Sequence, residues 1–204
     1  MRSRLSPFQH RILDVVAGLG WTLTGGGALA GFHLGHRETR DLDLFWHGRS
    51  TLDHLPAEIA RRLRDVGLTV DTLQHAPGFH QLRVSDAQTA IPVDLVADPS
   101  PCVEMPTEVS PGVQVDTPRE ILANKLTALL SRWAPRDLVD VQALLGSGIS
   151  LDSALRDAGR KDGGFSPPTL AWVLASSPSV GLDDAMLAFR DELIRQLVRA
   201  DTTA

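Results

Sequence analysis

Two aspartates lie two residues apart inside an apolar run, TRDLDLFW at positions 39–46. In a strand, residues two apart point to the same face, so Asp41 and Asp43 would present their carboxylates side by side. Neighbouring carboxylates raise each other's pKa unless a cation lies between them. Mg²⁺ is the natural cation, because it binds carboxylate oxygens together with substrate phosphates. A half-exposed strand that alternates apolar and acidic residues would show the same pattern, so the pair alone does not establish a metal site.

A glycine triplet precedes the acidic strand. Gly25, Gly26 and Gly27 follow an expected strand at 21–24 and precede a short expected helix, ALAGFHLG. Glycine lets the backbone approach a ligand closely, and the first N–H groups of a helix can bind phosphate. The triplet matches neither the dinucleotide-binding motif nor the lysine-bearing phosphate loop, and by itself it would indicate only a turn. Its position ahead of the acidic pair predicts a phosphate-binding turn beside a metal site.

A third carboxylate, Asp94, lies in another strand-like run, AIPVDLVAD. Three carboxylates on adjacent strands could hold two Mg²⁺ ions about 3.5–4 Å apart, the arrangement used for in-line phosphoryl chemistry. Asp94 could then also act as the base for an incoming hydroxyl. A solvent-facing acid on an edge strand is the alternative. Asp98 and Asp86 lie nearby, so the identity of the third carboxylate stays open between Asp94 and its neighbours.

Cations and further acids gather in the stretch NKLTALLSRWAPRDLVD. Lys125 and Arg132 are seven residues apart and share one helical face, while Asp137 and Asp140 are cofacial on the next helix, which also carries Arg136. A lysine on a helix is usually a solvated surface charge. Lys125, however, lies at the margin of an apolar stripe, where it could bind a triphosphate while Asp140 orients it through an ion pair.

The elements that must position these residues differ between the two halves of the chain. A capping box, Ser6 with Gln9, predicts a helix from Pro7. Further on, a helix is expected at 56–67, followed by three strands within 68–98 that could form an antiparallel meander. The proline-rich stretch after Asp98 resembles a surface connector, and the chain beyond it is mostly helical.

Composition limits the classes of function. The net charge of −5 provides no overall basic field to attract a polyanion, and the single cysteine, Cys102, permits no intrachain disulfide. No segment approaches the roughly 20 apolar residues that a membrane span needs. We therefore expect a cytoplasmic protein without a membrane partner.

Two of these blocks resemble motifs of a known family. GGGALAGFHLGHRETRDLDLFW resembles the first motif of the AbiEii/AbiGii-type nucleotidyltransferase toxins, a branch of the DNA polymerase β-like superfamily. ILANKLTALLSRWAPRDLVDVQALL resembles their later motif, a helical lysine followed by an arginine and an acidic helix. Together with Asp94, the likeness spans residues from about 20 to 145.

The resemblance implies an α/β (α+β) fold. A polymerase β-like nucleotidyltransferase core, with a mixed sheet flanked by helices, would occupy residues 1–100. A mostly helical C-terminal domain would occupy residues 101–204 and contribute Lys125 and Asp140 to the cleft that binds NTP and Mg²⁺.

The resemblance also implies roles for individual residues. The expected catalytic residues are Asp41, Asp43, Asp94, Lys125 and Asp140, of which Asp41, Asp43 and Asp94 would bind metal. The residues expected to bind the nucleotide are Gly25, Gly26, Gly27, Arg37, Arg132 and Arg136. Arg37 matches the arginine ahead of the acidic strand, with a structural or substrate-orienting role. Gly27 occupies a position where the wider superfamily usually has serine, so a hydroxyl contact to the γ-phosphate is missing here.

The implied activity is transfer of a nucleoside monophosphate from an NTP to an acceptor, a tRNA 3′ end or a protein, with Mg²⁺ and release of pyrophosphate. A cognate antitoxin protein would restrain this toxin. The negative net charge suits a small acceptor equally well, so a small-molecule nucleotidyltransferase of the antibiotic-modifying kind is an alternative. A non-catalytic nucleotide-binding module that acts through protein contacts is a second alternative.

Overall fold

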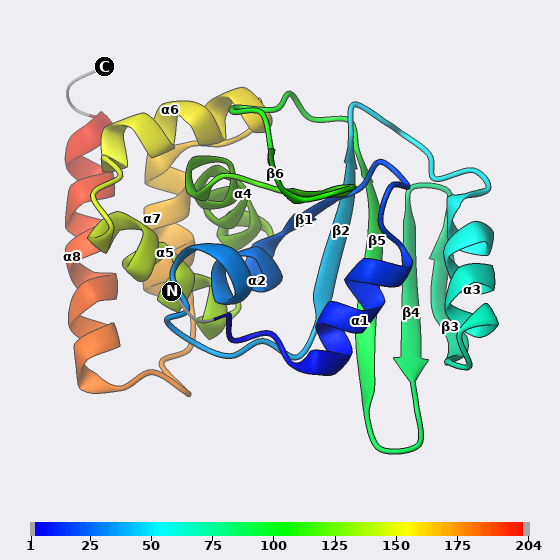
Figure 1. Cartoon of the computed structure of the whole chain (residues 1–204). Helices are drawn as coiled ribbons and strands as arrows, with labels where there is room; N and C mark the ends of the chain where they lie inside the picture. The colour runs from blue at the N-terminus through cyan, green and yellow to red at the C-terminus, as the bar shows by residue number, and fades with distance from the viewer. Residues whose placement is uncertain (1–2, 202–204) are drawn as a thin grey trace. The chain divides into compact units, whose positions relative to one another are not determined.

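The computed structural model describes residues 3–201, and the chain divides into two compact units, Met1–Thr117 and Pro118–Ala204 (Figure 1). The first unit extends beyond the expected boundary at residue 100, because strands β6 (Thr107–Ser110) and β7 (Val113–Val115) belong to its sheet. The contribution of Lys125 and Asp140 to the nucleotide cleft stays a prediction.

The first unit begins with helix α1 (Pro7–Val15), whose expected capping box is present. The Ser6 side chain accepts a hydrogen bond from Gln9 N at 3.1 Å, and the Gln9 side chain accepts one from Ser6 N at 2.8 Å. The elements that follow are β1 (Thr22–Thr24), α2 (Gly25–Ala28), a π-helical turn η1 (Leu29–His33), β2 (Leu42–His47), α3 (Leu55–Asp65), β3 (Thr69–Ala76), β4 (Phe79–Ser85) and β5 (Ala90–Asp98).

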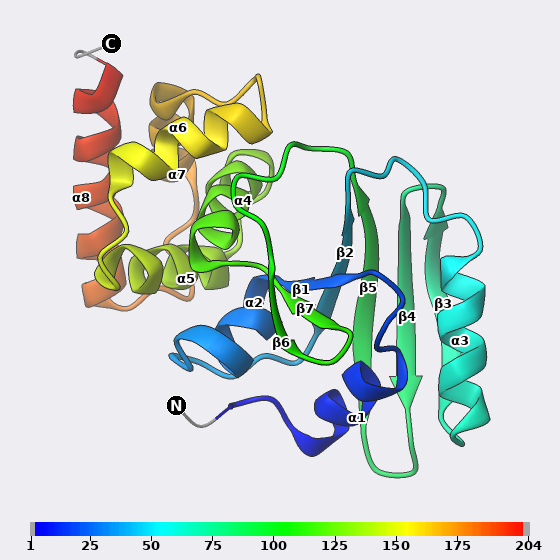
Figure 2. The same ribbon diagram turned by 45° about the horizontal axis from the view of Figure 1, so that its top comes forward.

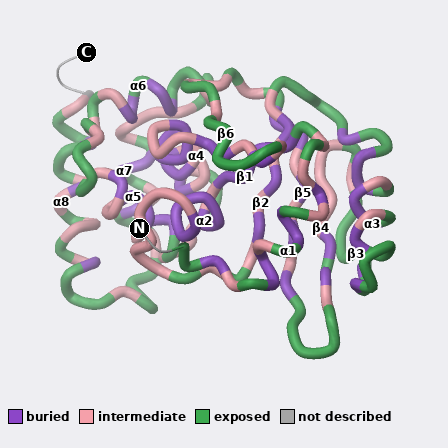
Figure 3. Tube along the Cα trace, viewed as in Figure 1, coloured by how far each residue is buried: buried purple, intermediate pink, exposed green. Residues whose placement is uncertain are grey.

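One seven-stranded mixed sheet organises this unit, in the order β3-β4-β5-β2-β1-β7-β6 (Figure 2). The expected antiparallel meander is confirmed, because β4 pairs antiparallel with both β3 and β5. Strand β2 lies parallel to β5 and antiparallel to β1. The mixed α/β fold class is therefore confirmed. At the edge, β3 is exposed along most of its length (Figure 3).

The two faces of the sheet differ in character. Leu42, Leu44 and Trp46 alternate along β2 and are buried, and the Trp46 indole donates a hydrogen bond at 3.0 Å to the Leu19 carbonyl just beyond α1. This face of the sheet is therefore the buried one. Burial of each leucine side chain stabilises the folded protein by about 1.5–3 kcal/mol. The residues between them point to the opposite face, which includes Asp43.

The prediction that the segment after Asp98 is a surface connector is partly wrong. Its last part forms a hairpin, in which β6 pairs antiparallel with β7, and β7 adds to the sheet parallel to β1. Val113 and Val115 bury their side chains, which is the physical reason that so short a strand joins the sheet. Gly112 makes the turn with a φ of +75°, and its N–H donates to the Glu108 side chain at 2.8 Å.

The second unit is helical, as expected. It contains α4 (Pro118–Ser131), α5 (Pro135–Gly146), α6 (Leu151–Lys161), α7 (Pro167–Ser176) and α8 (Asp184–Asp201). Helix α7 was not expected from the sequence, although Ser166 caps it and Pro167 stands at its first position. Arg119 of α4 forms an ion pair at 2.6 Å with the buried Asp157 of α6. Within residues 3–201, no helix combines the length and the apolar character that crossing a membrane would require.

Candidate active site

The pairing of four strands aligns polar side chains on the open face of the sheet. Parallel pairing of β2 with β5 places Asp43 directly opposite Asp94. On the far side of β5, Gln81 of β4 is the register partner of Asp94, and its amide donates to Asp94 Oδ1 at 2.9 Å. On the other side of β2, Thr24 of β1 is the partner of Asp43. Because neighbouring strands lie about 4.8 Å apart, the two carboxylates are close enough to share a cation.

The same register separates Asp98 from this site. Asp98 is the partner of His47, and its Oδ2 lies 3.3 Å from His47 Nδ1. Four residues along a strand correspond to about 13 Å, so Asp98 lies well away from Asp43. Asp86 belongs to the turn after β4, where its side chain accepts the N–H groups of Gln88 and Thr89 at 2.8 Å. The register therefore favours Asp94 as the third carboxylate.

Asp41 lies one residue ahead of β2 and is half-buried. The Thr39 hydroxyl donates to Asp41 Oδ1 at 2.5 Å. The buried Gln9 side chain donates to the main-chain oxygens of Thr39 and Asp41, at 3.3 and 3.4 Å. Gln9, which completes the capping box of α1, thus also binds the 39–41 segment that leads into β2.

The glycine triplet lies against the acidic strand, but it forms the first turn of α2 rather than a turn ahead of a helix. Gly25 has a φ of +59°, and a Cβ placed there would lie 2.5 Å from Asp43 Oδ2. A Cβ on Gly26 would lie 2.9 Å from the Arg37 guanidinium. A side chain at Gly25 or Gly26 would displace the end of the Asp43 or Arg37 side chain, so the structure brings Gly25, Gly26, Arg37 and Asp43 together. Gly27 instead faces the core, with Leu23 at 3.0 Å from a built Cβ.

The remaining predicted residues lie in the second unit. Lys125 Nζ lies 2.5 Å from Asp137 Oδ1 and 2.9 Å from Asp140 Oδ2, and both aspartates are fully buried. Burial alone would lower the Lys125 pKa, but the charges of Asp140 and Asp137 outweigh it and raise the pKa above its ordinary value. The expected Lys125–Asp140 pair is present. Arg132 is 3.5 Å from Asp137, and Arg136 is exposed.

Asp137 is a partner of Lys125 that sequence reasoning did not assign. Its spacing of three residues from Asp140 on one helical face was the available signal. Gln81, Thr39 and Thr24 were missed as neighbours of the acids, because their placement depends on strand pairing and loop geometry that leave no local pattern.

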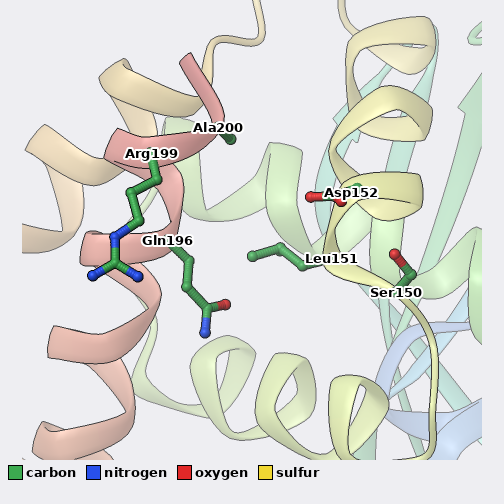
Figure 4. A pocket seen from close by; sticks show the side chains of 6 residues that line it. All are labelled: Ser150, Leu151, Asp152, Gln196, Arg199 and Ala200. Carbon is green, nitrogen blue, oxygen red and sulfur yellow. The ribbon is translucent and has the colours of Figure 1, made fainter. Parts of the chain in front are cut away.

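Two hollows within the second unit involve none of the predicted residues. The first has a volume of about 370 Å³ and lies between the start of α6 and the end of α8. Leu151 extends into this space, with Gln196 and Arg199 on the α8 side (Figure 4). The second, of about 300 Å³, is lined by the apolar residues Pro168, Ala171, Trp172, Ala175, Ile194 and Val198. The second hollow has no titratable side chain in its lining and is unsuited to acid–base chemistry.

A charged cluster around His47 was also missed. His47 bridges two acids, with Nδ1 at 3.3 Å from Asp98 Oδ2 and Nε2 at 2.9 Å from Asp116 Oδ1. Burial alone would lower the His47 pKa, but hydrogen bonds and charges from Asp116 and Asp98 outweigh it and raise the pKa from 6.5 to about 9. The cluster therefore links β2, β5 and the segment after β7 through a protonated imidazole.

The His47 cluster should make stability depend on pH. Because the folded-state pKa of about 9 lies above the unfolded value, the stabilisation is complete below pH 6.5 and is lost as the pH rises toward 9. The difference corresponds to about 3 kcal/mol. In urea titrations, the stability difference between the wild type and His47→Gln should shrink by about this amount between pH 6 and pH 9.5. A difference that is independent of pH would contradict this account.

Comparisons with known proteins identify a family and a fold. The family model described as "Nucleotidyl transferase AbiEii toxin, Type IV TA system" matches residues 9–203. Among curated proteins, none matches significantly. The structure of MenT4, a nucleotidyltransferase toxin from Mycobacterium tuberculosis H37Rv, is similar with a TM-score of 0.63 and 17% identity, over 95% of this chain and 82% of that one. JHP933 from Helicobacter pylori is similar with a TM-score of 0.56 and 16% identity, over 98% and 97% of the two chains.

These matches confirm the resemblance inferred from the two motifs. The solved structures support the fold, and the family model covers both motifs and nearly the whole chain between the termini. The chain therefore belongs to the AbiEii family of nucleotidyltransferase toxins, the toxins of type IV toxin–antitoxin systems.

Proposed function

We propose that the protein transfers a nucleoside monophosphate from an NTP to the 3′ end of a tRNA and releases pyrophosphate. The observation that carries the proposal is the register pair of Asp43 and Asp94, of which Asp43 lies against the glycine turn at Gly25. A binding module without chemistry has no physical need for two cofacial acids beside such a turn.

The donor set fits Mg²⁺. Asp41, Asp43 and Asp94 offer only hard carboxylate oxygens, the ligands that Mg²⁺ prefers. Gly25 carries no side chain, so the backbone comes close to Asp43 here, and a Cβ on Gly25 would lie 2.5 Å from Asp43 Oδ2. When bound by these three residues, Mg²⁺ would neutralise the triphosphate and polarise the α-phosphorus.

The chain's own groups would do the rest. Gly25 and Gly26 let the phosphates approach the backbone, and the Arg37 guanidinium beside Gly26 orients them. Asp94, held by Gln81, accepts the proton of the acceptor hydroxyl. The bond from this oxygen to the α-phosphorus forms as the bond to pyrophosphate breaks.

The resemblance assigns the leaving pyrophosphate to Lys125, with Arg132 and Arg136 as further nucleotide contacts. Lys125 already neutralises Asp137 and Asp140 in the second unit, so its part in the reaction stays a prediction. The family implies an NTP substrate and an antitoxin partner. We take that partner to be a cognate protein, in a cytoplasmic setting.

A labelling assay tests the proposal. The protein is incubated with Mg²⁺, total tRNA and each of the four NTPs, labelled in parallel at the α- or the γ-phosphate. We expect label on tRNA from one or more α-labelled NTPs, none from the γ-labelled NTPs, and none in EDTA. Label on the toxin or another protein would identify a protein acceptor. Label that appears only on an added aminoglycoside would establish the small-molecule alternative.

A further inference from the structure

The side chain of Thr24 has a polar atom that the folded chain leaves unused. Thr24 is 4% exposed, and its Oγ1 is buried without a hydrogen-bond partner. It stands at the N-cap position of α2, where threonine normally accepts a backbone N–H, yet its side chain makes no such bond. A buried hydroxyl without a partner destabilises the protein, so its presence calls for an explanation.

The position of Thr24 in the sheet suggests an explanation for its unpaired hydroxyl. Thr24 is the register partner of Asp43, and antiparallel partners project to the same face at close range. The next residue, Gly25, brings the backbone so close to Asp43 that a Cβ there would lie 2.5 Å from Oδ2. The buried hydroxyl is therefore adjacent to the central carboxylate of the predicted metal site, on the side away from Asp94.

We propose that Thr24 is a positioning residue for the metal site, whose hydroxyl donates a hydrogen bond to the Asp43 carboxylate when Asp43 binds a divalent cation. Carboxylates that bind metals are themselves held by outer hydrogen bonds, and loss of such a bond weakens metal binding about 10- to 100-fold. Burial of Oγ1 suits this role, because the hydroxyl acts through Asp43 and does not need to reach the ligand. The inference rests on the proposed function for the identity of the metal site.

Two substitutions separate the hydroxyl from the shape of the side chain. Thr24→Val keeps the volume and branching and removes only the hydroxyl, whereas Thr24→Ser keeps the hydroxyl. Thr22→Val is the matched control, because Thr22 is equally buried on the same strand and is opposed to Phe45 rather than to an acid.

Binding of Mn²⁺, measured by electron paramagnetic resonance without nucleotide, is the main readout. We expect Thr24→Val to bind Mn²⁺ about 10- to 100-fold more weakly, with Thr24→Ser and Thr22→Val close to the wild type. In EDTA, Thr24→Val should unfold at the same temperature as the wild type or higher, because it removes an unsatisfied group. A merely structural hydroxyl would give the reverse: lower stability with unchanged Mn²⁺ affinity.

The outcomes distinguish this inference from the proposed function. If the wild type transfers NMP but Thr24→Val binds Mn²⁺ as tightly as the wild type, the positioning role is overturned and the proposed function stands. If Thr24→Val loses Mn²⁺ affinity but the wild type modifies no acceptor, the positioning role stands and the proposed transfer is wrong. Absence of Mn²⁺ binding by the wild type overturns the inference.

Discussion

Asp43→Asn should lower the rate of NMP transfer about 1000-fold or more while the protein remains folded. Asp43 lies between Asp94 and Thr24 in the row of polar side chains, so it is the central ligand of the predicted cation. A metal ion supplies several kcal/mol of transition-state stabilisation, and each 1.4 kcal/mol changes the rate about tenfold. Asparagine keeps the size of the side chain but removes its charge. The initial rate of transfer from an α-labelled NTP measures the effect.

This variant should remain folded in EDTA, because asparagine fills nearly the same volume as aspartate at this position of β2. Asp71→Asn is a matched control, because Asp71 lies in the same sheet on the exposed edge strand β3 and faces Arg83. It should retain the wild-type rate. A variant at Asp43 that is folded and fully active would refute the metal site.

Lys125→Met should destabilise the protein by about 3–5 kcal/mol. The substitution leaves Asp137 and Asp140 fully buried without the cation that lies 2.5 and 2.9 Å from them. Two charges of the same sign in the interior are costly, so the second unit should unfold at lower denaturant concentration. Urea unfolding at pH 7, followed by circular dichroism of the helices, measures this loss.

Two further variants test the cause. Arg132→Met removes a guanidinium that is 59% exposed and 3.5 Å from Asp137, and it should cost less than about 1 kcal/mol. The triple variant Lys125→Met, Asp137→Asn and Asp140→Asn also removes the two buried negative charges that Lys125 contacts and should recover much of the loss. If Lys125→Met alone is as stable as the wild type, the buried ion pairs contribute nothing. Inactivity of a Lys125 variant therefore indicates catalysis only when its folding has been measured.

Local signals account for the parts of the fold that were predicted. The capping box depends on two residues three positions apart, Ser6 and Gln9, and alternation along β5 is visible within nine residues. The 107–115 hairpin was missed because its strands are short and proline-rich sequence surrounds them. Its stability comes from pairing with β1, a contact between segments about 90 residues apart in the chain that no local pattern encodes.

In the candidate site, too, local sequence patterns predicted some features, whereas others depend on contacts between distant segments. The shared face of Asp41 and Asp43 was predictable, because residues two apart on a strand point the same way. The Lys125–Asp140 pair was also expected, although it joins α4 to α5 and periodicity within one helix does not determine it. The choice between Asp94 and Asp98 was not predictable, because it depends on the parallel register of β2 and β5. Once Asp43 is opposite Asp94, a step of four residues on each strand places His47 opposite Asp98, so a single pairing determines both contacts.

The pairing of His47 with Asp98 also disfavours a shifted alignment of β2 along β5. If β2 shifted by two residues along β5, every leucine would still face the core, since side-chain direction repeats every second residue. Apolar burial alone therefore does not distinguish the shifted sheet from the native one. The shift would, however, separate His47 from Asp98 and leave a buried acid without its cation. The ion pair at one end of β2 thus locks the alignment that brings Asp43 and Asp94 together at the other end.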